Sequence, residues 1–366
     1  MSVTPGQRLA RLRLASQGLA GSRAASPAEV VRSMMAMQAQ DFAGAKWSVG
    51  VRLPGSTEAQ VDRALAEGSI VRSWPMRGTL HFVAPEDLGW ILKLTTDRLI
   101  AGAARRLAAL ELDEKQLETA RAAAQDALHG GRALTRVQMH DVFAKAGVSP
   151  RSQRGYQILW YLAQTGTLCF GPPQPKQQTF VLLDEWVSKP RRLERDEALG
   201  ELAERYFASH GPSTLKDFAW WSSLRMKDAR TALAVASPRL AEMEVEESTY
   251  YLSPDADAGP GAGAGEPTMP ATMALPAFDE FLLGYQDRSA QVPIEHAGKV
   301  MPPGGGTFLP TIVAEGIVVG TWTRTSTARG IKLNIAPFRT LNRGLEAGFA
   351  RAAADYAAFR GVTLLA

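Results

Sequence analysis

Helix start signals recur along this chain at short intervals, and they constrain its fold more than any other feature. Residues 4–7 (TPGQ) form a capping box with proline in the first turn, and residues 26–29 (SPAE) repeat that chemistry. Residues 57–60 (TEAQ) form a third box without the proline. Because apolar residues follow each box at helical spacing for only a few turns, the sequence predicts short helices that pack against one another.

A hairpin pattern follows the third of these helices. Residues 70–83 (IVRSWPMRGTLHFV) carry β-branched and aromatic residues on both sides of a Pro-Met-Arg-Gly tip. Three short helices and a hairpin are the element order of a winged helix, and the order returns in residues 113–183 and 193–252. Residues 308–338 then read as strands turning at Glu315-Gly316, and a last helix is expected over residues 341–359.

These patterns predict an α+β fold that is mostly helical, with three tandem winged-helix units. The predicted divisions are winged-helix units at 1–110, 111–190 and 191–252, a flexible Pro/Gly-rich linker or wing tip at 253–272, and a β-rich scaffold with the final helix at 273–366. The GAGAG within the linker is no phosphate loop, because no lysine follows it and no strand–turn–helix pattern surrounds it.

Composition narrows the class of protein. A hydrophobic content of 45% excludes a disordered chain, and no apolar run approaches the roughly 20 residues of a membrane span. The N-terminus lacks the apolar core of a signal peptide, and the single cysteine, Cys169, excludes an internal disulfide and a cysteine-rich zinc site. We therefore expect a cytoplasmic protein, and its net charge of +4 is only mildly basic.

The sequence MMAMQAQDF places Gln38 and Gln40 at the end of an apolar run. Residues two apart point roughly 200° away from each other on a helix, whereas in extended backbone they lie on one side. For both amides to act together, the chain must therefore leave helical geometry near Met37. The alternative is structural, with Gln38 capping the helix and Gln40 solvated in a loop.

Five motifs in a fixed order point to a family. They are QAQ before an aromatic residue, RSWPMRGTLHFV, GPSTLKDFAWW, LPAFDEFLLGYQDR and GTWTR. Together they resemble the AlkZ/YcaQ-like bacterial DNA glycosylases, from Leu9 to Phe338. The resemblance implies tandem winged helices in a C-shaped scaffold around a DNA channel, and excision of bulky N-alkylated purines, including those in interstrand crosslinks. The family's catalytic signature is Gln-Φ-Gln or Gln-Φ-Asp, and Gln38-Ala39-Gln40 matches the first form.

Two glutamines suit a substrate that is already activated. A glutamine amide donates and accepts hydrogen bonds but cannot take a proton as a general base. A purine alkylated at N7 or N3 is cationic and leaves as a neutral base, so a positioned water and a stabilised sugar cation suffice. We therefore predict that Gln38 positions the water and that Gln40 makes a second contact with the water or the sugar.

Six further residues are candidates for DNA contact. Arg77 lies at a predicted wing tip, Trp74 and His81 flank it, Arg324 ends the GTWTR motif, and Tyr285 and Arg288 belong to the motif that the resemblance places near DNA. For His81 a structural role is the stronger alternative, and for Arg77 the alternative is a solvated turn. Trp220 and Trp221 read as core.

Two other functions are open from the residues. One is a non-catalytic winged-helix regulator or architectural DNA binder, and the other is a hydrolase using Asp279 or Asp287. The preferred prediction is a monofunctional glycosylase that acts as a monomer on double-stranded DNA at the bacterial nucleoid, without metal or cofactor. No lysine adjoins Gln38, although Lys46 leaves Schiff-base chemistry as an alternative.

Overall fold

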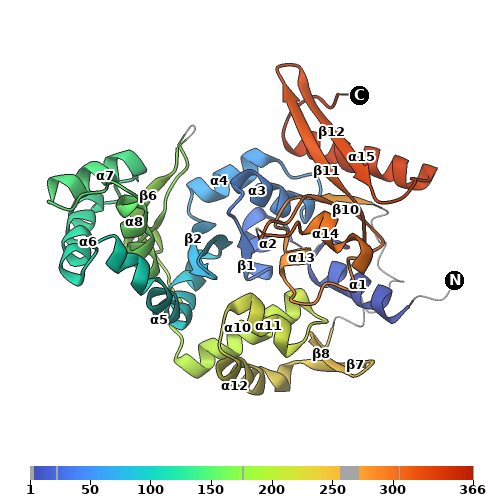
Figure 1. Ribbon diagram of the computed structural model, residues 1–366, viewed down its shortest axis with the longest axis horizontal. Helices are drawn as coiled ribbons and strands as arrows, with labels where there is room; N and C mark the ends of the chain where they lie inside the picture. The colour runs from blue at the N-terminus through green and yellow to red at the C-terminus, as the bar shows by residue number, and fades with distance from the viewer. Residues whose placement is uncertain (1–3, 22–23, 175–176, 256–271, 305, 366) are drawn as a thin grey trace. The chain divides into compact units, whose positions relative to one another are not determined.

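A computed structural model describes residues 4–21, 24–174, 177–255, 272–304 and 306–365 of the chain. The chain divides into two compact units, one of Met1–Val61 with Leu199–Ala366 and one of Asp62–Ala198 (Figure 1). Both units combine helices with antiparallel strands, so the α+β class is confirmed. No helix among the described residues has both the length and the apolar character needed to cross a bilayer.

The first unit begins with short helices and gains two later groups of elements. Its helices are α1 (Pro5–Ser16), α2 (Pro27–Ser33), α3 (Phe42–Val51), α10 (Arg195–His210, which starts just before the division), α11 (Leu215–Ser222), α12 (Met226–Ala236), α13 (Glu280–Leu283), α14 (Ala297–Val300) and α15 (Arg343–Phe359). Its strands are β1 (Ala36–Gln38), β7 (Ala241–Val245), β8 (Ser248–Leu252), β9 (Met273–Leu275), β10 (Thr311–Ala314), β11 (Ile317–Thr327) and β12 (Gly330–Pro337).

The second unit follows α4 (Glu58–Ala66), which contains the division. Its helices are α5 (Pro85–Ala109), α6 (Glu114–Leu128), α7 (Arg136–Lys145), α8 (Arg154–Gln164) and α9 (Leu183–Trp186). Its strands are β2 (Val71–Met76), β3 (Thr79–Val83), β4 (Leu134–Thr135), β5 (Leu168–Phe170) and β6 (Thr179–Leu182), which are neighbours in the order β3-β2-β5-β6-β4.

The predicted helix starts are present where the sequence places them. Thr4 and Gln7 exchange both capping-box hydrogen bonds, and the Ser26 hydroxyl accepts from the N–H of Glu29. The hairpin tip at Arg77-Gly78 has positive φ at both residues, as a two-residue turn between antiparallel strands requires. Local sequence therefore determines these element boundaries.

The predicted order of three helices and a hairpin occurs twice, with only the short strand β4 (Leu134–Thr135) inserted in one case and a 3-10 turn at Ser237–Arg239 in the other. It runs through α10, α11, α12 and the pair β7–β8, and again through α6, α7, α8 and the pair β5–β6. The first predicted unit is different, since β1 and α3 stand between its helices and its hairpin lies in the other compact unit. The three-unit division stays a prediction, and most of its linker, residues 256–271, lies outside the described residues.

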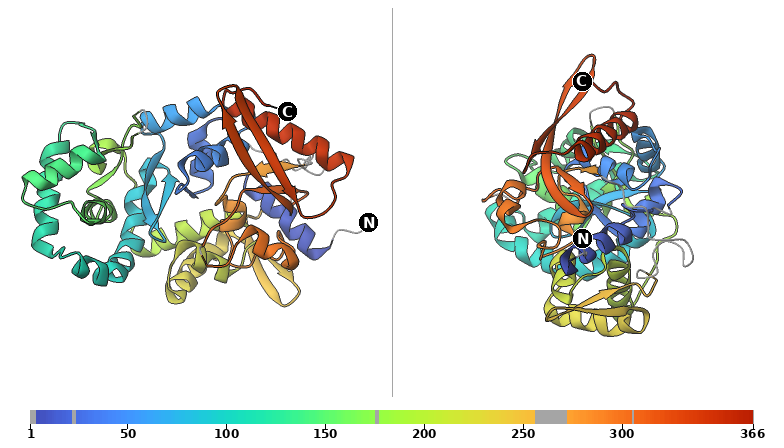
Figure 2. Two further views of the ribbon diagram at one scale, coloured as in Figure 1. Left: turned by 45° about the horizontal axis from the view of Figure 1, so that its top comes forward. Right: turned by 90° about the vertical axis from the view of Figure 1, so that its right-hand side faces the viewer.

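In the first unit, β9 to β12 form a four-stranded antiparallel sheet in the order β12-β11-β10-β9, and α15 runs beside it (Figure 2). Tyr356 of α15 packs against Trp322 of β11 and Trp47 of α3, with ring centroids 5.3 and 5.1 Å apart. Phe359 extends the contact to Trp47 at 5.2 Å. Aromatic side chains therefore join the last helix to both the sheet and α3.

The contact between α15 and α3 requires a glycine. A Cβ added to Gly50 of α3 would lie 2.5 Å from the Phe359 ring, whereas one added to Gly89 of α5 would meet nothing within 4 Å. Gly50→Ala is therefore expected to lower the free energy of unfolding by about 1–3 kcal/mol through overpacking. Gly89→Ala is the matched control and is expected to raise it by about 0.5–1 kcal/mol, because alanine favours helix. Urea titration of both variants measures the difference, and equal effects would contradict the packing.

Candidate active site

The two candidate glutamines follow a sharp break in the backbone. Helix α2 ends at Ser33, Met35 takes a φ of 65°, and β1 carries the chain in extended form to Gln38. The helix therefore ends earlier than the predicted exit near Met37, and the extended strand ends at Gln38, ahead of a bend at Gln40, so the joint action of the two amides stays a prediction. A left-handed methionine is costly, so the surrounding structure has to hold this break in place.

Gln38 is only 8% exposed, while Gln40 is exposed and Ala39 between them is fully buried. The Gln38 side-chain Oε1 accepts a hydrogen bond from the backbone N–H of Gln40 at 3.3 Å. The backbone N–H of Gln38 donates to Glu280 Oε1 at 2.8 Å. The two glutamines are thus linked locally, and a carboxylate 242 residues away in sequence holds the strand that bears them.

Glu280 is itself almost completely buried, at 1% exposure. Its Oε2 accepts from the indole N–H of Trp221 at 3.0 Å and lies 3.5 Å from Nε2 of His210. Hydrogen bonds from an amide and an indole N–H compensate for the loss of hydration of this carboxylate. Trp221 is core, as predicted, and it contacts the site through Glu280.

The neighbouring carboxylate, Asp279, belongs to a buried ion pair. It accepts from Arg52 through two hydrogen bonds of 2.8 Å and from the Ser48 hydroxyl. Arg52 also donates to the backbone oxygen and the side-chain Oε1 of Gln17. Because Asp279 caps α13 at the N–H of Phe281, the same ion pair fixes the position of Glu280. Asp279 is thus engaged in structure, whereas Asp287, the other carboxylate of the hydrolase alternative, is exposed and accepts from the backbone N–H of Ser289 at 2.9 Å.

Tyr285 does not fit the expected DNA contact. It is fully buried, its hydroxyl donates to the backbone oxygen of His210 at 2.8 Å, and Gln17 donates to it at 3.1 Å. Burial raises its pKa, and the guanidinium of Arg13 lies 3.8 Å from its ring centroid. A side chain in this position supports the interior of the unit, so the expectation of direct contact is corrected.

Arg288 is held by the same region. Its guanidinium lies over the rings of Trp220 and Phe308, at 4.8 and 4.9 Å, and donates to the backbone oxygens of Leu282 and Gln286. These contacts give the arginine of the motif a structural role, because its guanidinium links side chains and backbone oxygens from different segments of the chain. Arg288 is half-buried, and its contact with DNA stays a prediction.

Three further candidates lie in the second unit. Trp74, 2% exposed, packs on Phe170 with ring centroids 5.0 Å apart, and His81 is fully buried. His81 Nδ1 lies 2.9 Å from the backbone oxygen of Thr79, and its Nε2 lies 2.9 Å from Nη2 of Arg77. A neutral imidazole with its proton on Nδ1 satisfies both contacts. The expectation that Trp74 and His81 contact DNA directly is therefore corrected. Arg77, half-buried at the turn, stays a candidate.

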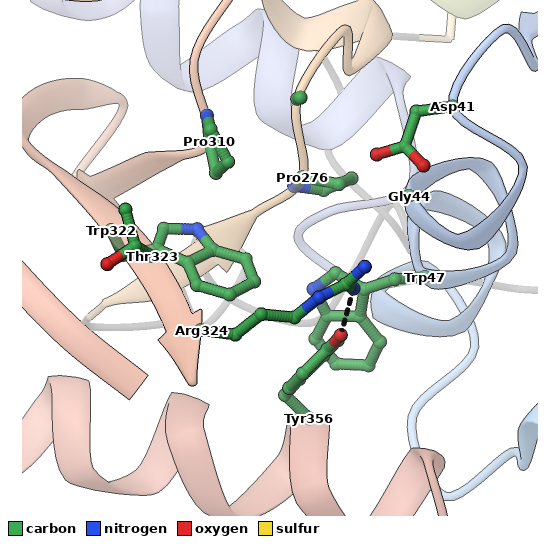
Figure 3. Close-up of a pocket in the computed structure, with 10 residues that line it drawn as sticks. Asp41, Gly44, Trp47, Pro276, Pro310, Trp322, Thr323, Arg324 and Tyr356 are labelled. Carbon is green, nitrogen blue, oxygen red and sulfur yellow. Dashed lines mark hydrogen bonds between the residues drawn. The ribbon is translucent and has the colours of Figure 1, made fainter. Parts of the chain in front are cut away.

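Arg324 lies at a cavity of about 240 Å³ in the first unit (Figure 3). Its Nη1 donates to the hydroxyl of Tyr356 at 2.6 Å, and the residue is exposed. The other lining residues are Asp41, Gly44, Trp47, Pro276, Ala277, Pro310, Trp322, Thr323 and Tyr356. The cavity adjoins the glutamine segment, since Asp41 follows Gln40 directly.

Comparison with known proteins identifies the family. A family model described as DNA glycosylase AlkZ-like matches residues 31–359. The chain belongs to this family. A relative, the interstrand DNA cross-link repair glycosylase of Streptomyces sahachiroi, is 28% identical over 313 residues, which are 81% of this chain and 82% of that protein. The solved structure of Streptomyces sahachiroi DNA glycosylase AlkZ matches with a TM-score of 0.81 and 26% identity, over 100% of this chain and 99% of the other.

This AlkZ-like protein is therefore a DNA glycosylase, an enzyme that acts on DNA, and the alternative of a non-catalytic regulator is wrong. Among the described residues, no three His, Cys, Asp or Glu side chains gather closely enough to hold a metal ion. The sequence analysis did not identify the buried residues that hold the Gln38 backbone in place. The available signal was the arginine that directly follows the apolar residues 42–51, since Arg52 at this position needs a buried acid as its partner.

Proposed function

We propose that this glycosylase hydrolyses the N-glycosidic bond of cationic N7- or N3-alkylated purines in double-stranded DNA, including those that form interstrand crosslinks. Gln38 positions the attacking water, and Gln40 makes a second contact with that water or with the sugar. The observation that carries the proposal is the hydrogen bond of 2.8 Å from the Gln38 N–H to buried Glu280. The family and its crosslink-repair relative support the class of substrate.

The chemistry is matched to the weak basicity of amides. Alkylation at N7 or N3 places a positive charge on the base, so the departing group is neutral and needs no protonation. What remains is to aim a water at the sugar and to stabilise its developing positive charge, which a fixed amide oxygen can do. Anchoring by Glu280 keeps the Gln38 backbone in place, so no reorganisation is required when the bond breaks.

We propose a monofunctional enzyme, because the nearest lysine is poorly suited to Schiff-base formation. The Nζ atom of Lys46 lies 2.6 Å from Oε1 of Glu58, and the residue is 8% exposed. Glu58 also pairs with Arg360 at 2.6 Å. An amino group that is held by a carboxylate in an ion pair is poorly placed to attack a sugar. Hydrolysis by water is the step that these contacts favour.

The proposal is tested with a duplex containing one 7-methylguanine. Incubation with the protein should yield abasic sites, seen as strand breaks only after alkali treatment. Breaks that form without alkali, or a covalent product trapped by borohydride, would contradict the monofunctional mechanism. Intact strands after alkali would contradict excision of this base. A crosslinked duplex tested in parallel reports unhooking as the appearance of separated strands on a denaturing gel.

We further propose that the protein works as a monomer on chromosomal DNA in the bacterial cytoplasm. Its proposed partner is duplex DNA that carries the damaged base. Arg77 and Arg324 are the candidate backbone contacts, because an arginine fork binds two phosphate oxygens at once. Light scattering of the protein with and without a short duplex measures the stoichiometry, and a dimer would contradict the proposal.

A further inference from the structure

A buried histidine, His210 at the end of α10, lies against the carboxylate that holds the Gln38 strand. The side chains of His210 and Glu280 are 0% and 1% exposed, and Nε2 of the ring lies 3.5 Å from Glu280 Oε2. The same oxygen accepts from the indole N–H of Trp221 at 3.0 Å, and the other carboxylate oxygen accepts from the Gln38 N–H at 2.8 Å. One carboxylate therefore connects the glutamine strand to a titratable ring in the interior of the unit.

Hydrogen bonds at the other ring nitrogen of His210 decide where its hydrogen lies. Nδ1 is 2.8 Å from the hydroxyl oxygen of Ser209. That hydroxyl donates to the backbone oxygen of Arg205 at 2.7 Å, one helical turn earlier. Because a hydroxyl has a single hydrogen, its oxygen accepts from the ring, so Nδ1 carries a hydrogen. If Nε2 carried none, its lone pair would face the carboxylate of Glu280 and be repelled by it.

The buried charges of the first unit favour a second hydrogen on this ring. Arg52 lies 2.8 Å from Asp279, and Arg13 lies 3.9 Å from Asp217, so each of these arginines has an acid beside it. Glu280 is a further buried acid of the same unit. A buried carboxylate is costly without a positive partner. The imidazole ring at 3.5 Å supplies that partner when both of its nitrogens carry a hydrogen.

Aromatic rings enclose the imidazole of His210. Tyr206 stacks on it with ring centroids 4.8 Å apart and an interplanar angle of 11°, and the Trp221 ring lies at 5.2 Å. The faces of aromatic rings attract a cation, so these contacts also favour the charged ring. A Cβ added to Gly284 would lie 2.5 Å from Cδ2 of the imidazole, which leaves the ring little room to turn away. The titratable and charged groups around the ring are Tyr206, Glu280 and Tyr285, joined by Arg13 over the Tyr285 ring and Asp217 beside Arg13.

We propose that His210 is a positioning residue of this glycosylase, a buried imidazolium that holds the Glu280 carboxylate ionised and in place so that Glu280 can hold the Gln38 backbone. Its effect on excision rests on the proposed function, whereas the protonation of the ring does not. A neutral ring would set a lone pair against the carboxylate. The carboxylate would then shift or take up a proton, and the Gln38 N–H would lose a fixed acceptor.

The protonation is tested by NMR of the full chain with isotope-labelled histidine. At about pH 8, where an ordinary histidine is neutral, both ring nitrogens of His210 should have the chemical shifts of an imidazolium. In Glu280→Gln the ring loses its carboxylate and should be neutral at the same pH. Replacing each of the other histidines in turn by glutamine assigns the signals. A neutral His210 ring in the wild-type protein, or a charged one in Glu280→Gln, overturns the proposal.

Excision kinetics show whether the charge acts through Gln38. His210→Gln should lower kcat for release of 7-methylguanine by about 10- to 100-fold with little change in KM, because a displaced amide affects only the breaking of the bond. The double variant with Glu280→Gln should lose less than the product of the two single losses, since both changes break one interaction. His129→Gln is the matched control. It removes a histidine that pairs with Glu185 at 2.9 Å on the surface of the second unit, so kcat should be unchanged.

Circular dichroism confirms that each variant is folded, and the spectra of the wild-type protein and Glu280→Gln decide the protonation even if His210→Gln does not fold. A folded His210→Gln protein that excises at the wild-type rate overturns the positioning role, and so do losses that multiply fully with those of Glu280→Gln. Failure of the proposed function is distinct from these results. No excision by the wild-type protein overturns that function and the effect on excision, while a charged ring that depends on Glu280 supports the buried pair.

Discussion

Gln38→Ala is expected to slow release of 7-methylguanine from duplex DNA by about 10²–10³-fold, with little change in affinity for the duplex. The reason is that a positioned amide oxygen acts on charge that develops only as the bond breaks, so its removal lowers kcat more than it raises KM. Alkali-revealed strand breaks, followed under single-turnover conditions, measure the rate. A gel shift of the same duplex measures the affinity.

Two further variants show whether this loss is specific. Gln125→Ala removes an exposed glutamine from α6 and should leave the rate unchanged. Glu280→Gln keeps an oxygen that can accept from the Gln38 N–H, so it should retain more activity than Gln38→Ala. A Gln38→Ala protein that excises at the wild-type rate would refute the water-positioning role.

Arg52→Ala is expected to lower the free energy of unfolding by about 3–5 kcal/mol, the cost of leaving a buried charge without its partner. Both side chains of the Arg52–Asp279 pair are almost completely buried, at 1% and 2% exposure. Losing Arg52 also leaves the side-chain oxygen of Gln17 without its donor. Urea titration followed by circular dichroism measures the change.

A surface pair gives the matched comparison. Arg11 contacts Glu315 at 2.7 Å, with 33% and 68% of the two side chains exposed. Arg11→Ala should therefore cost no more than about 1 kcal/mol, since solvent screens the pair. Equal losses in Arg11→Ala and Arg52→Ala would contradict a special role for the buried network. Because Asp279 caps α13 and so fixes Glu280, folded Arg52→Ala protein should also excise 7-methylguanine more slowly.

The sequence alone determined the local elements of this protein. A capping box at Thr4 and an N-cap at Ser26 placed helix starts, and the tip at Arg77-Gly78 placed a hairpin, because caps and tight turns depend on a few neighbouring residues. The ordered motifs also identified the glycosylase family. The extended backbone at Gln38 was predicted by the requirement that both amides act together, although the helix ended earlier than expected.

Only the tertiary structure decided which side chains meet. The expected DNA contacts at Trp74, His81 and Tyr285 lie in the interior, because a strand or loop pattern does not reveal which face neighbouring elements cover. The bond from Gln38 to Glu280 and the meeting of Asp41 with Arg324 at one cavity join residues more than 200 positions apart. Such contacts result from packing of whole elements, and no local pattern of residues encodes them.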